Sequence, residues 1–294
     1  MNTIDLHNHT IASLDGTYQP EELVDIALNS NIEIMAVCDH DSVESCQRAL
    51  CYSKDKNITV IPAIELSCKI DDTPLHILGY NIDYIDKAYQ QRYQYVRQAV
   101  DQWTPQIIQK ALDYGFKFDP QKPYTYRQDH VVCEELIGRA IFEDHRNDDD
   151  ERLKDFRTGG KYSDNPTFNF YKYLCATNKP LYVPYSFNMD IKDAEKLIHQ
   201  TGGKMFLAHP FHNIKKSESL FEKIVACNID GVEVFSSYHD KETTDYYYQL
   251  AKKYNLYMSV GSDFHGESKP AIKMGCNDYD HEELEKTIKF IQNK

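Results

Sequence analysis

Short apolar runs alternate with helical patterns along this chain, and this alternation constrains the fold more than any other feature. Short runs of mostly apolar residues are typical of buried strands. They span residues 3–6, 34–38, 58–64, 75–80, 204–208, 231–235 and 257–261. Helical patterns lie between most of them, as after Pro20, where a proline and two acids suit a first turn. The alternation predicts an α/β fold around a parallel sheet.

Further helices are expected at residues 42–53, 190–201, 217–228, 241–254 and 281–292. One connection differs, because Asp71 and Asp72 lie between two strand-like runs as the residues of a hairpin turn would. This pair of strands is therefore expected to be antiparallel. About seven strands suit a single barrel-like core.

Residues 82–185 interrupt the strand and helix rhythm. This segment contains a Tyr- and Gln-rich helical stretch, an acidic run at 148–151 and a loop through Gly159 and Gly160. We expect a barrel formed by residues 1–81 and 186–294, with 82–185 as an inserted, mainly helical subdomain. Inserted segments at barrel mouths serve as solvated decorations or as lids over substrate, and the sequence leaves both open.

Charge and cysteine content limit the classes of partner. The chain has 294 residues and a net charge of -13, which argues against binding long nucleic acid by general charge attraction. A small anionic substrate held by metal ions remains compatible with it. Eight cysteines without a CxxC pair are expected to be reduced thiols of a cytoplasmic protein. No apolar run approaches the length of a membrane span, and the oligomeric state is left open.

Residues of the types that bind metals recur at or near strand ends. His7 and His9 follow the first strand two positions apart, so their side chains project to the same side. The carboxyl ends of parallel barrel strands meet on one face, which brings distant residues together. The candidate ligands are His7, His9, Asp15, His40, Glu65, His76, His209, Asp263 and His265.

This set of side chains predicts a particular chemistry. Carboxylates and imidazoles without thiolates suit manganese, zinc, iron or magnesium, and nine ligands exceed what one catalytic ion takes from protein. Two or three divalent metal ions are therefore expected. Clustered cations polarise phosphoryl oxygens and acidify a bridging water, so the predicted reaction is phosphate ester hydrolysis by a metal-bound hydroxide.

Other polar residues near strand ends are candidates for supporting functions. His212 and His239 follow the fifth and sixth strands, where they would bind phosphate or donate a proton to the leaving oxygen, unless they serve the fold alone. Asp39 and Asp41 flank His40. We expect them to orient His40 without binding a metal, or to cap the following helix.

The motifs DLHNHTIASLDG, AVCDHDS, IPAIE, HILGY, GGKMFLAHP, GVEVF and VGSDFHG together resemble the PHP (polymerase and histidinol phosphatase) superfamily. Within it the chain is most similar to stand-alone phosphoesterases that hydrolyse small nucleotides or oligonucleotides. The resemblance implies a distorted (β/α)7 barrel with a trinuclear metal centre.

The resemblance also implies which residues share a metal. It places His7, His9, Glu65 and Asp263 around one ion, Glu65, His76 and His209 around a second, and Asp15, His40 and His265 around a third. Relatives show an R-P-H-I-A-R type segment where this chain reads E-E-L-I-G-R, so only Arg139 is retained. Arg139 is the candidate for binding substrate phosphate.

The expected function is metal-dependent hydrolysis of a phosphate monoester or terminal phosphodiester on a small nucleotide-like substrate. Examples are a nucleoside monophosphate, a 3',5'-bisphosphate or a short oligonucleotide. The alternatives are a histidinol-phosphate phosphatase, an amidohydrolase-type metal hydrolase, and a non-catalytic module that binds a partner through the inserted helices.

Overall fold

The computed structural model describes residues 3–127, 129, 131–275 and 278–293. The chain forms two compact units: residues 1–93, 188–266 and 272–294 form the first, and residues 94–187 and 267–271 form the second. Seven cysteines are described and all of them are free thiols, whereas Cys276 lies outside the described residues.

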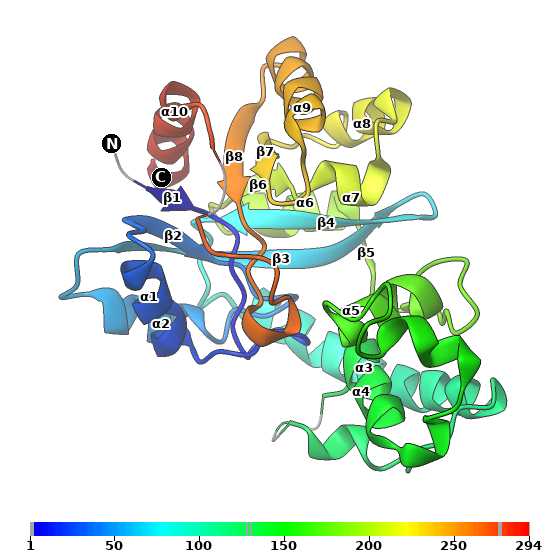
Figure 1. Cartoon of the computed structure of the whole chain (residues 1–294). Helices are drawn as coiled ribbons and strands as arrows, with labels where there is room; N and C mark the ends of the chain where they lie inside the picture. The colour runs from blue at the N-terminus through cyan, green and yellow to red at the C-terminus, as the bar shows by residue number, and fades with distance from the viewer. Residues whose placement is uncertain (1–2, 128, 130, 276–277, 294) are drawn as a thin grey trace. The chain divides into compact units, whose positions relative to one another are not determined.

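The first unit is built on one sheet that curves toward closure (Figure 1). Its strands, in spatial order, are β1 (Ile4–Asp5), β2 (Ile34–Val37), β3 (Thr59–Ile70), β4 (Thr73–Tyr80), β6 (Lys204–Leu207), β7 (Gly231–Ser236) and β8 (Tyr257–Gly261). The short β5 (Met189–Asp190) pairs with β3. Just beyond β1, Leu6 N donates to Val260 O of β8 at 2.9 Å, which joins the two ends of the sheet.

Strand direction changes at one place in this sheet. The pairs β1–β2, β2–β3, β6–β7 and β7–β8 are parallel, whereas β4 runs antiparallel to both β3 and β6. The predicted hairpin is confirmed, and its turn begins at Asp71, which has a φ of 51°. The apolar pattern predicted that β3 would end before Glu65. The strand instead continues to Ile70, because residues 66–70 pair with β4 in the hairpin. In this register His76 lies opposite Ser67, two residues beyond Glu65.

Helices pack outside the sheet of the first unit, and their apolar faces join its core. They are α1 (Pro20–Asn29), α2 (Cys46–Ser53), α6 (Ile191–Gln200), α7 (Pro210–Ile214), α8 (Glu218–Val225), α9 (Lys241–Lys253) and α10 (His281–Gln292). Three helices begin after an aspartate whose carboxylate accepts hydrogen bonds from backbone N–H groups, namely Asp190, Asp240 and Asp280. Such caps satisfy donors that the first helical turn leaves unpaired.

The described residues of the second unit form helices and connecting loops and contain no strand. α3 (Lys87–Asp113) begins in the first unit and continues into the second, where α4 (Glu134–Glu143) and α5 (Pro166–Phe170) follow. The shorter helical turns are η1 (Pro123–Thr125), η2 (His145–Asn147), η3 (Glu151–Phe156) and the π-helical η4 (Tyr171–Cys175). This unit has an apolar core of its own, which includes Trp103, Phe116 and Phe170. Among the described residues, no helix is long and apolar enough to cross a bilayer.

His199, near the end of α6, connects this helix to the loop before β7. Its Nδ1 lies 3.0 Å from Glu195 Oε1 and its Nε2 lies 2.8 Å from Asp230 Oδ2. Asp230 Oδ2 also accepts a hydrogen bond from Met205 N at the start of β6, at 2.7 Å. Partial burial alone would lower the pKa of His199, but the hydrogen bonds to Asp230 and Glu195 outweigh it and raise that pKa above 6.5.

The raised pKa predicts that His199 stabilises the fold in a pH-dependent way. The protonated ring favours the folded state, so its contribution is complete below the unfolded pKa near 6.5 and is lost as pH rises through the higher folded pKa. We expect His199→Gln to reduce the free energy of unfolding most at pH 5.5–6.5 and progressively less toward pH 9. Urea denaturation of metal-free protein measures this difference.

The control is His145→Gln, since the His145 side chain is 94% exposed and its Nδ1 lies 3.1 Å from the exposed carboxylate of Asp148. It should change stability little at any pH. A deficit of His199→Gln that stays constant from pH 5.5 to 9 would show that the ring acts through packing and not through its charge.

Candidate metal centre

Glu65 of β3 is the carboxylate around which the candidate site is organised. Its side chain is fully buried, and five imidazole nitrogens lie close to its two oxygens. The distances to Oε2 are 3.2 Å from His7 Nε2, 3.2 Å from His9 Nε2 and 3.1 Å from His40 Nδ1. The distances to Oε1 are 3.0 Å from His76 Nδ1 and 3.0 Å from His209 Nε2.

Asp263, just after β8, is the second buried carboxylate of the cluster. Its Oδ1 lies 3.0 Å from His9 Nε2 and 3.3 Å from His7 Nε2. Its backbone N donates to His7 O at 2.9 Å, so the segment after β8 lies against the segment after β1. Asp263 has a φ of 58°, and aspartate tolerates this left-handed conformation better than most side chains do.

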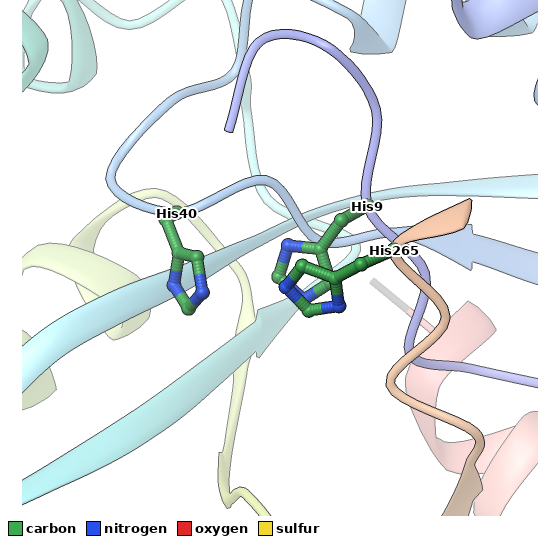
Figure 2. A group of neighbouring side chains, drawn as sticks. All are labelled: His9, His40 and His265. Atoms are coloured by element: carbon green, nitrogen blue, oxygen red, sulfur yellow. The ribbon is translucent and has the colours of Figure 1, made fainter. Parts of the chain in front are cut away.

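A third carboxylate, Asp15, faces the outer part of the cluster. Its oxygens lie 3.2 Å from His265 Nε2 and 3.8 Å from His40 Nε2. Figure 2 shows His9, His40 and His265, which come from three segments far apart in the sequence. The rings of His9 and His265 are stacked with centroids 3.9 Å apart, and those of His9 and His40 are 4.6 Å apart.

The structure thus brings all nine candidate ligands into one cluster. Ligand atoms of eight of them form three groups, each within 4.8 Å: His7 with Glu65, His209 and Asp263; His40 with Glu65 and His76; and His9 with His40 and His265. Asp15, the ninth, contacts His265 and His40 as described above. These groups differ from those that the resemblance implied. His209 joins the first set in place of His9, His9 joins His40 and His265 in place of Asp15, and His40 also lies with Glu65 and His76. His9 Nε2 nevertheless lies within 3.2 Å of Glu65, so the assignment of ligands to individual ions stays a prediction.

The chemistry of the cluster fits divalent cations. Four imidazole nitrogens, His7 Nε2, His9 Nε2, His40 Nδ1 and His76 Nδ1, face the buried Glu65 carboxylate at 3.0–3.2 Å. Imidazole nitrogens and carboxylate oxygens that face a common space are the ligands that zinc and manganese prefer.

Electrostatic coupling in the cluster controls its protons. Burial alone lowers the pKa of His9, but hydrogen bonds to Asp263 and Glu65 and their charges raise that pKa to about 9. Burial is outweighed in the same way at His7, where charges led by Glu65 raise the pKa well above 6.5. At His40 burial dominates and holds the pKa well below its usual value. A cation that binds these rings has to displace the protons they carry.

Asp39 organises the loop that carries two of the histidines. Its Oδ1 accepts hydrogen bonds from Thr10 N at 2.6 Å and from Ser13 Oγ at 3.0 Å. Ser13 Oγ also lies 2.8 Å from His9 Nδ1 and accepts a hydrogen bond from His40 N at 2.9 Å. Asp39 therefore reaches His9 and the backbone of His40 through Ser13.

Asp41 has a different set of contacts from those the sequence suggested. Arg92, buried on α3, donates from Nε to Asp41 Oδ1 at 2.8 Å, and Ser67 N donates to the same oxygen at 3.2 Å. The residue that precedes α2 is Ser45, so neither Asp39 nor Asp41 caps this helix. Asp41 instead fixes the segment after β2 to β3, close to His40 and Glu65.

The candidate substrate-binding residues lie in contrasting surroundings. His239 Nδ1 donates to Val234 O at 2.8 Å, its Nε2 accepts from Phe211 N at 3.4 Å, and burial lowers its pKa below 6.5. Substrate binding or proton transfer by His239 stays a prediction. For either function, His239 would have to give up one of its hydrogen bonds to the backbone. His212 is exposed, and its ring centroid lies 5.6 Å from that of His209.

Arg139, the other candidate for phosphate binding, lies on α4 of the second unit. Its Nε donates to Glu143 Oε1 at 2.8 Å, and its guanidinium lies 4.3 Å from the centroid of the Tyr126 ring. Its side chain is half exposed, and phosphate binding by Arg139 stays a prediction.

Two residues of the β7 segment contact candidate ligands and were not among the residues predicted from the sequence. Glu233 Oε2 lies 2.7 Å from His7 Nδ1, and Tyr238 Oη donates to Asp263 Oδ2 at 2.5 Å. Glu233 was detectable, because it is an acid at the centre of the apolar run GVEVF. Tyr238 carried no such signal in a chain with 22 tyrosines.

Comparison with known proteins places this geometry in a family context. Residues 5–143 match the family model of the PHP domain. A 3',5'-nucleoside bisphosphate phosphatase of Chromobacterium violaceum is 28% identical over 281 residues, covering 94% of this chain and 91% of the relative. A 5'-3' exoribonuclease of Haemophilus influenzae is 27% identical, with 89% of each protein covered. The 5'-3' exoribonuclease Rnm of Escherichia coli is 28% identical, covering 92% of this chain and 87% of the relative.

Solved structures share the fold. An amidohydrolase from Chromobacterium violaceum with bound sulfate superposes with a TM-score of 0.78 at 22% identity, covering 94% of this chain and 91% of that one. A protein of Bifidobacterium adolescentis assigned as a metal-dependent phosphoesterase gives 0.76 at 20% identity, covering 97% and 95%. The predicted fold, a distorted PHP-type barrel with a mainly helical insertion, is confirmed.

The protons of the cluster lead to a prediction for metal binding. Because the pKa of His9 is about 9 and that of His7 is raised, Mn²⁺ binding at pH 7.5 should release at least one proton. Its apparent affinity should then rise about tenfold per pH unit for each proton displaced. Titration calorimetry in two buffers with different ionisation enthalpies measures the number of protons released.

Glu65→Gln is the variant to titrate beside the wild type, because it removes the central charge and keeps the side-chain volume. It should bind Mn²⁺ far more weakly. Binding heats that are the same in both buffers for the wild type would refute the proposed displacement of protons.

Proposed function

We propose that this chain, which belongs to the PHP domain family of metal-dependent phosphoester hydrolases, hydrolyses a terminal phosphate ester of a small nucleotide-like molecule. The bond broken is that of a phosphate monoester or of a terminal phosphodiester. The observation that carries the proposal is the convergence of five imidazoles on the buried Glu65 carboxylate, with Asp15 and Asp263 beside them.

We further propose that two or three divalent cations, drawn from manganese, zinc, iron and magnesium, bind this cluster. His7, His9, Glu65 and Asp263 would hold the first, and Glu65, His76 and His209 the second. Asp15, His40 and His265 would hold the third. Such cations supply Lewis acidity at phosphoryl oxygens, lower the pKa of a water nucleophile and neutralise the leaving oxygen.

The residues of the chain contribute orientation and the exclusion of water. Glu65 and Asp263 are buried, and so are His7, His9 and His265, so the site is rigidly packed on its inner side. His40 and His76 are partly exposed, with 13% and 33% of their side chains accessible. This more exposed side is where we expect a phosphate to approach.

A small substrate fits the charge of the chain better than a long polyanion does. The net charge of -13 disfavours general attraction of nucleic acid, whereas a single phosphate can enter a local site. The relatives are named as a nucleoside bisphosphate phosphatase and as 5'-3' exoribonucleases. Both names imply substrates that are phosphate esters of nucleotides. This shared chemistry supports a nucleotide-like substrate for the present chain.

Exposed His212 and Arg139 are the proposed contacts to substrate phosphate. His212 lies beside His209 and Tyr238, with ring centroids 5.6 and 5.4 Å away. Arg139 has the guanidinium geometry that suits phosphate oxygens, although it would have to share its bond to Glu143. The helical second unit that carries Arg139 is proposed as a lid over substrate.

The proposal predicts phosphate release from one class of nucleotide. Mn²⁺-loaded protein would be incubated with nucleoside 3',5'-bisphosphates, nucleoside monophosphates, short 5'-phosphorylated oligoribonucleotides and histidinol phosphate, and the products would be separated by chromatography. Glu65→Gln should lower kcat/KM by at least about 10³-fold, equivalent to about 4 kcal/mol. The matched control is Glu222→Gln on the exposed face of α8, which should be as active as the wild type.

Substrate-binding residues should separate from metal ligands in the same assay. His212→Ala and Arg139→Ala should raise KM roughly tenfold, the value of one charged hydrogen bond, and leave kcat nearly unchanged. Arg146→Ala is the control for Arg139, because Arg146 is an exposed arginine bonded to a neighbouring carboxylate, Asp144. Turnover of histidinol phosphate alone, or of no phosphate ester by metal-loaded protein, would contradict the proposal.

A further inference from the structure

Of the seven strands β1, β2, β3, β4, β6, β7 and β8 that form the barrel, β7 is the one that supplies none of the nine candidate ligands. Two residues of its segment nevertheless contact ligands from other strands. Glu233 lies within β7 and Tyr238 lies two residues beyond its end. We propose that Glu233 and Tyr238 are positioning residues that hold His7 and Asp263 in the orientation needed to bind a divalent cation. This inference rests on the proposed function and extends it from the ligands to the residues that orient them.

The contact between Glu233 and His7 fixes the orientation of the ring. Glu233 Oε2 lies 2.7 Å from His7 Nδ1, and both side chains are fully buried. A carboxylate at this position accepts the Nδ1 proton, so the lone pair of the neutral ring is on Nε2. That atom faces Glu65 Oε2 at 3.2 Å and Asp263 Oδ1 at 3.3 Å. A carboxylate bonded to the far nitrogen also makes the imidazole a stronger ligand.

The backbone around this pair leaves space for it. A Cβ on Gly261 of β8 would lie 2.3 Å from His7 Cβ and 3.1 Å from Glu233 Oε2. Any larger residue at position 261 would therefore displace the histidine. The absence of a side chain at Gly261 permits the close packing of His7 and Glu233.

The contact between Tyr238 and Asp263 involves a second candidate ligand. Tyr238 Oη donates to Asp263 Oδ2 at 2.5 Å, whereas Asp263 Oδ1 faces His7 and His9. The hydroxyl therefore occupies one oxygen and directs the other toward the cluster. The Tyr238 ring also lies edge-on to His209, with centroids 5.7 Å apart, so one half-buried side chain contacts two candidate ligands.

A purely structural function is the alternative for both residues, and it makes a different prediction. A residue that serves only folding should lower the stability of the metal-free protein and leave the metal affinity of the folded protein unchanged. A positioning residue should lower metal affinity more than stability. Glu233→Gln distinguishes charge from hydrogen bonding, because the glutamine oxygen still accepts the Nδ1 proton.

The experiment measures Mn²⁺ affinity and metal-free stability for each variant. We expect Glu233→Leu and Tyr238→Phe to weaken Mn²⁺ binding by about 10–100-fold, as loss of a ligand-orienting partner does, with a smaller loss for Glu233→Gln. Affinity would be followed by titration calorimetry with a competing chelator, and stability by urea denaturation in chelator. Tyr248→Phe is the matched control, since Tyr248 Oη donates to Asp280 Oδ2 at 3.2 Å outside the cluster. It should leave affinity unchanged.

Two outcomes would overturn the inference. If Tyr238→Phe and Glu233→Leu both bind Mn²⁺ as tightly as the wild type, these residues do not position ligands. If the wild type itself binds no divalent cation, this inference and the proposed function fail together. A wild type that binds Mn²⁺ but hydrolyses no phosphate ester would refute the proposed function while the positioning inference stands on the affinities.

Discussion

The burial of Glu65 among five histidines is the interaction on which the rest of this site depends. A carboxylate removed from water is strongly destabilised unless cationic or hydrogen-bonding partners surround it. Here imidazole nitrogens lie 3.0–3.2 Å from both oxygens. These rings come from the segments after β1, β2 and β6 and from β4 itself, so the cluster exists only when the barrel is assembled. The fold and the candidate metal centre are therefore one structure and not a site added to a scaffold.

Closure of the barrel gives the cluster its inner wall. Asp5 at the end of β1 accepts hydrogen bonds from His7 N, Ser262 N and Gly275 N, at 3.2, 3.0 and 2.7 Å. This one carboxylate joins the first strand to the segment that follows the last strand, and so brings His7 and Asp263 together. The antiparallel β4 has a similar effect, because its inverted direction places His76 beside the middle of β3 and close to Glu65.

The sequence predicted the strands, the hairpin and the set of nine candidate ligands, because each depends on local apolar runs and on residue types near strand ends. It could not predict that β3 extends to Ile70, since continuation of a strand past a charged residue depends on its pairing partner. It also missed Glu233 and Tyr238, whose contacts to His7 and Asp263 join residues 226 and 25 positions apart. Such contacts depend on how neighbouring strands are aligned, and a single sequence pattern does not contain that information.

The most direct test of this account is an anomalous diffraction experiment on crystals of the protein soaked in Mn²⁺, with data collected on both sides of the manganese absorption edge. The account predicts two or three manganese peaks within the cluster, at least two of them adjacent to the Glu65 carboxylate. It also predicts that these peaks disappear from crystals of Glu65→Gln. Absence of manganese from the cluster in the wild type, or peaks at other sites alone, would contradict the claim that these nine residues form a metal centre.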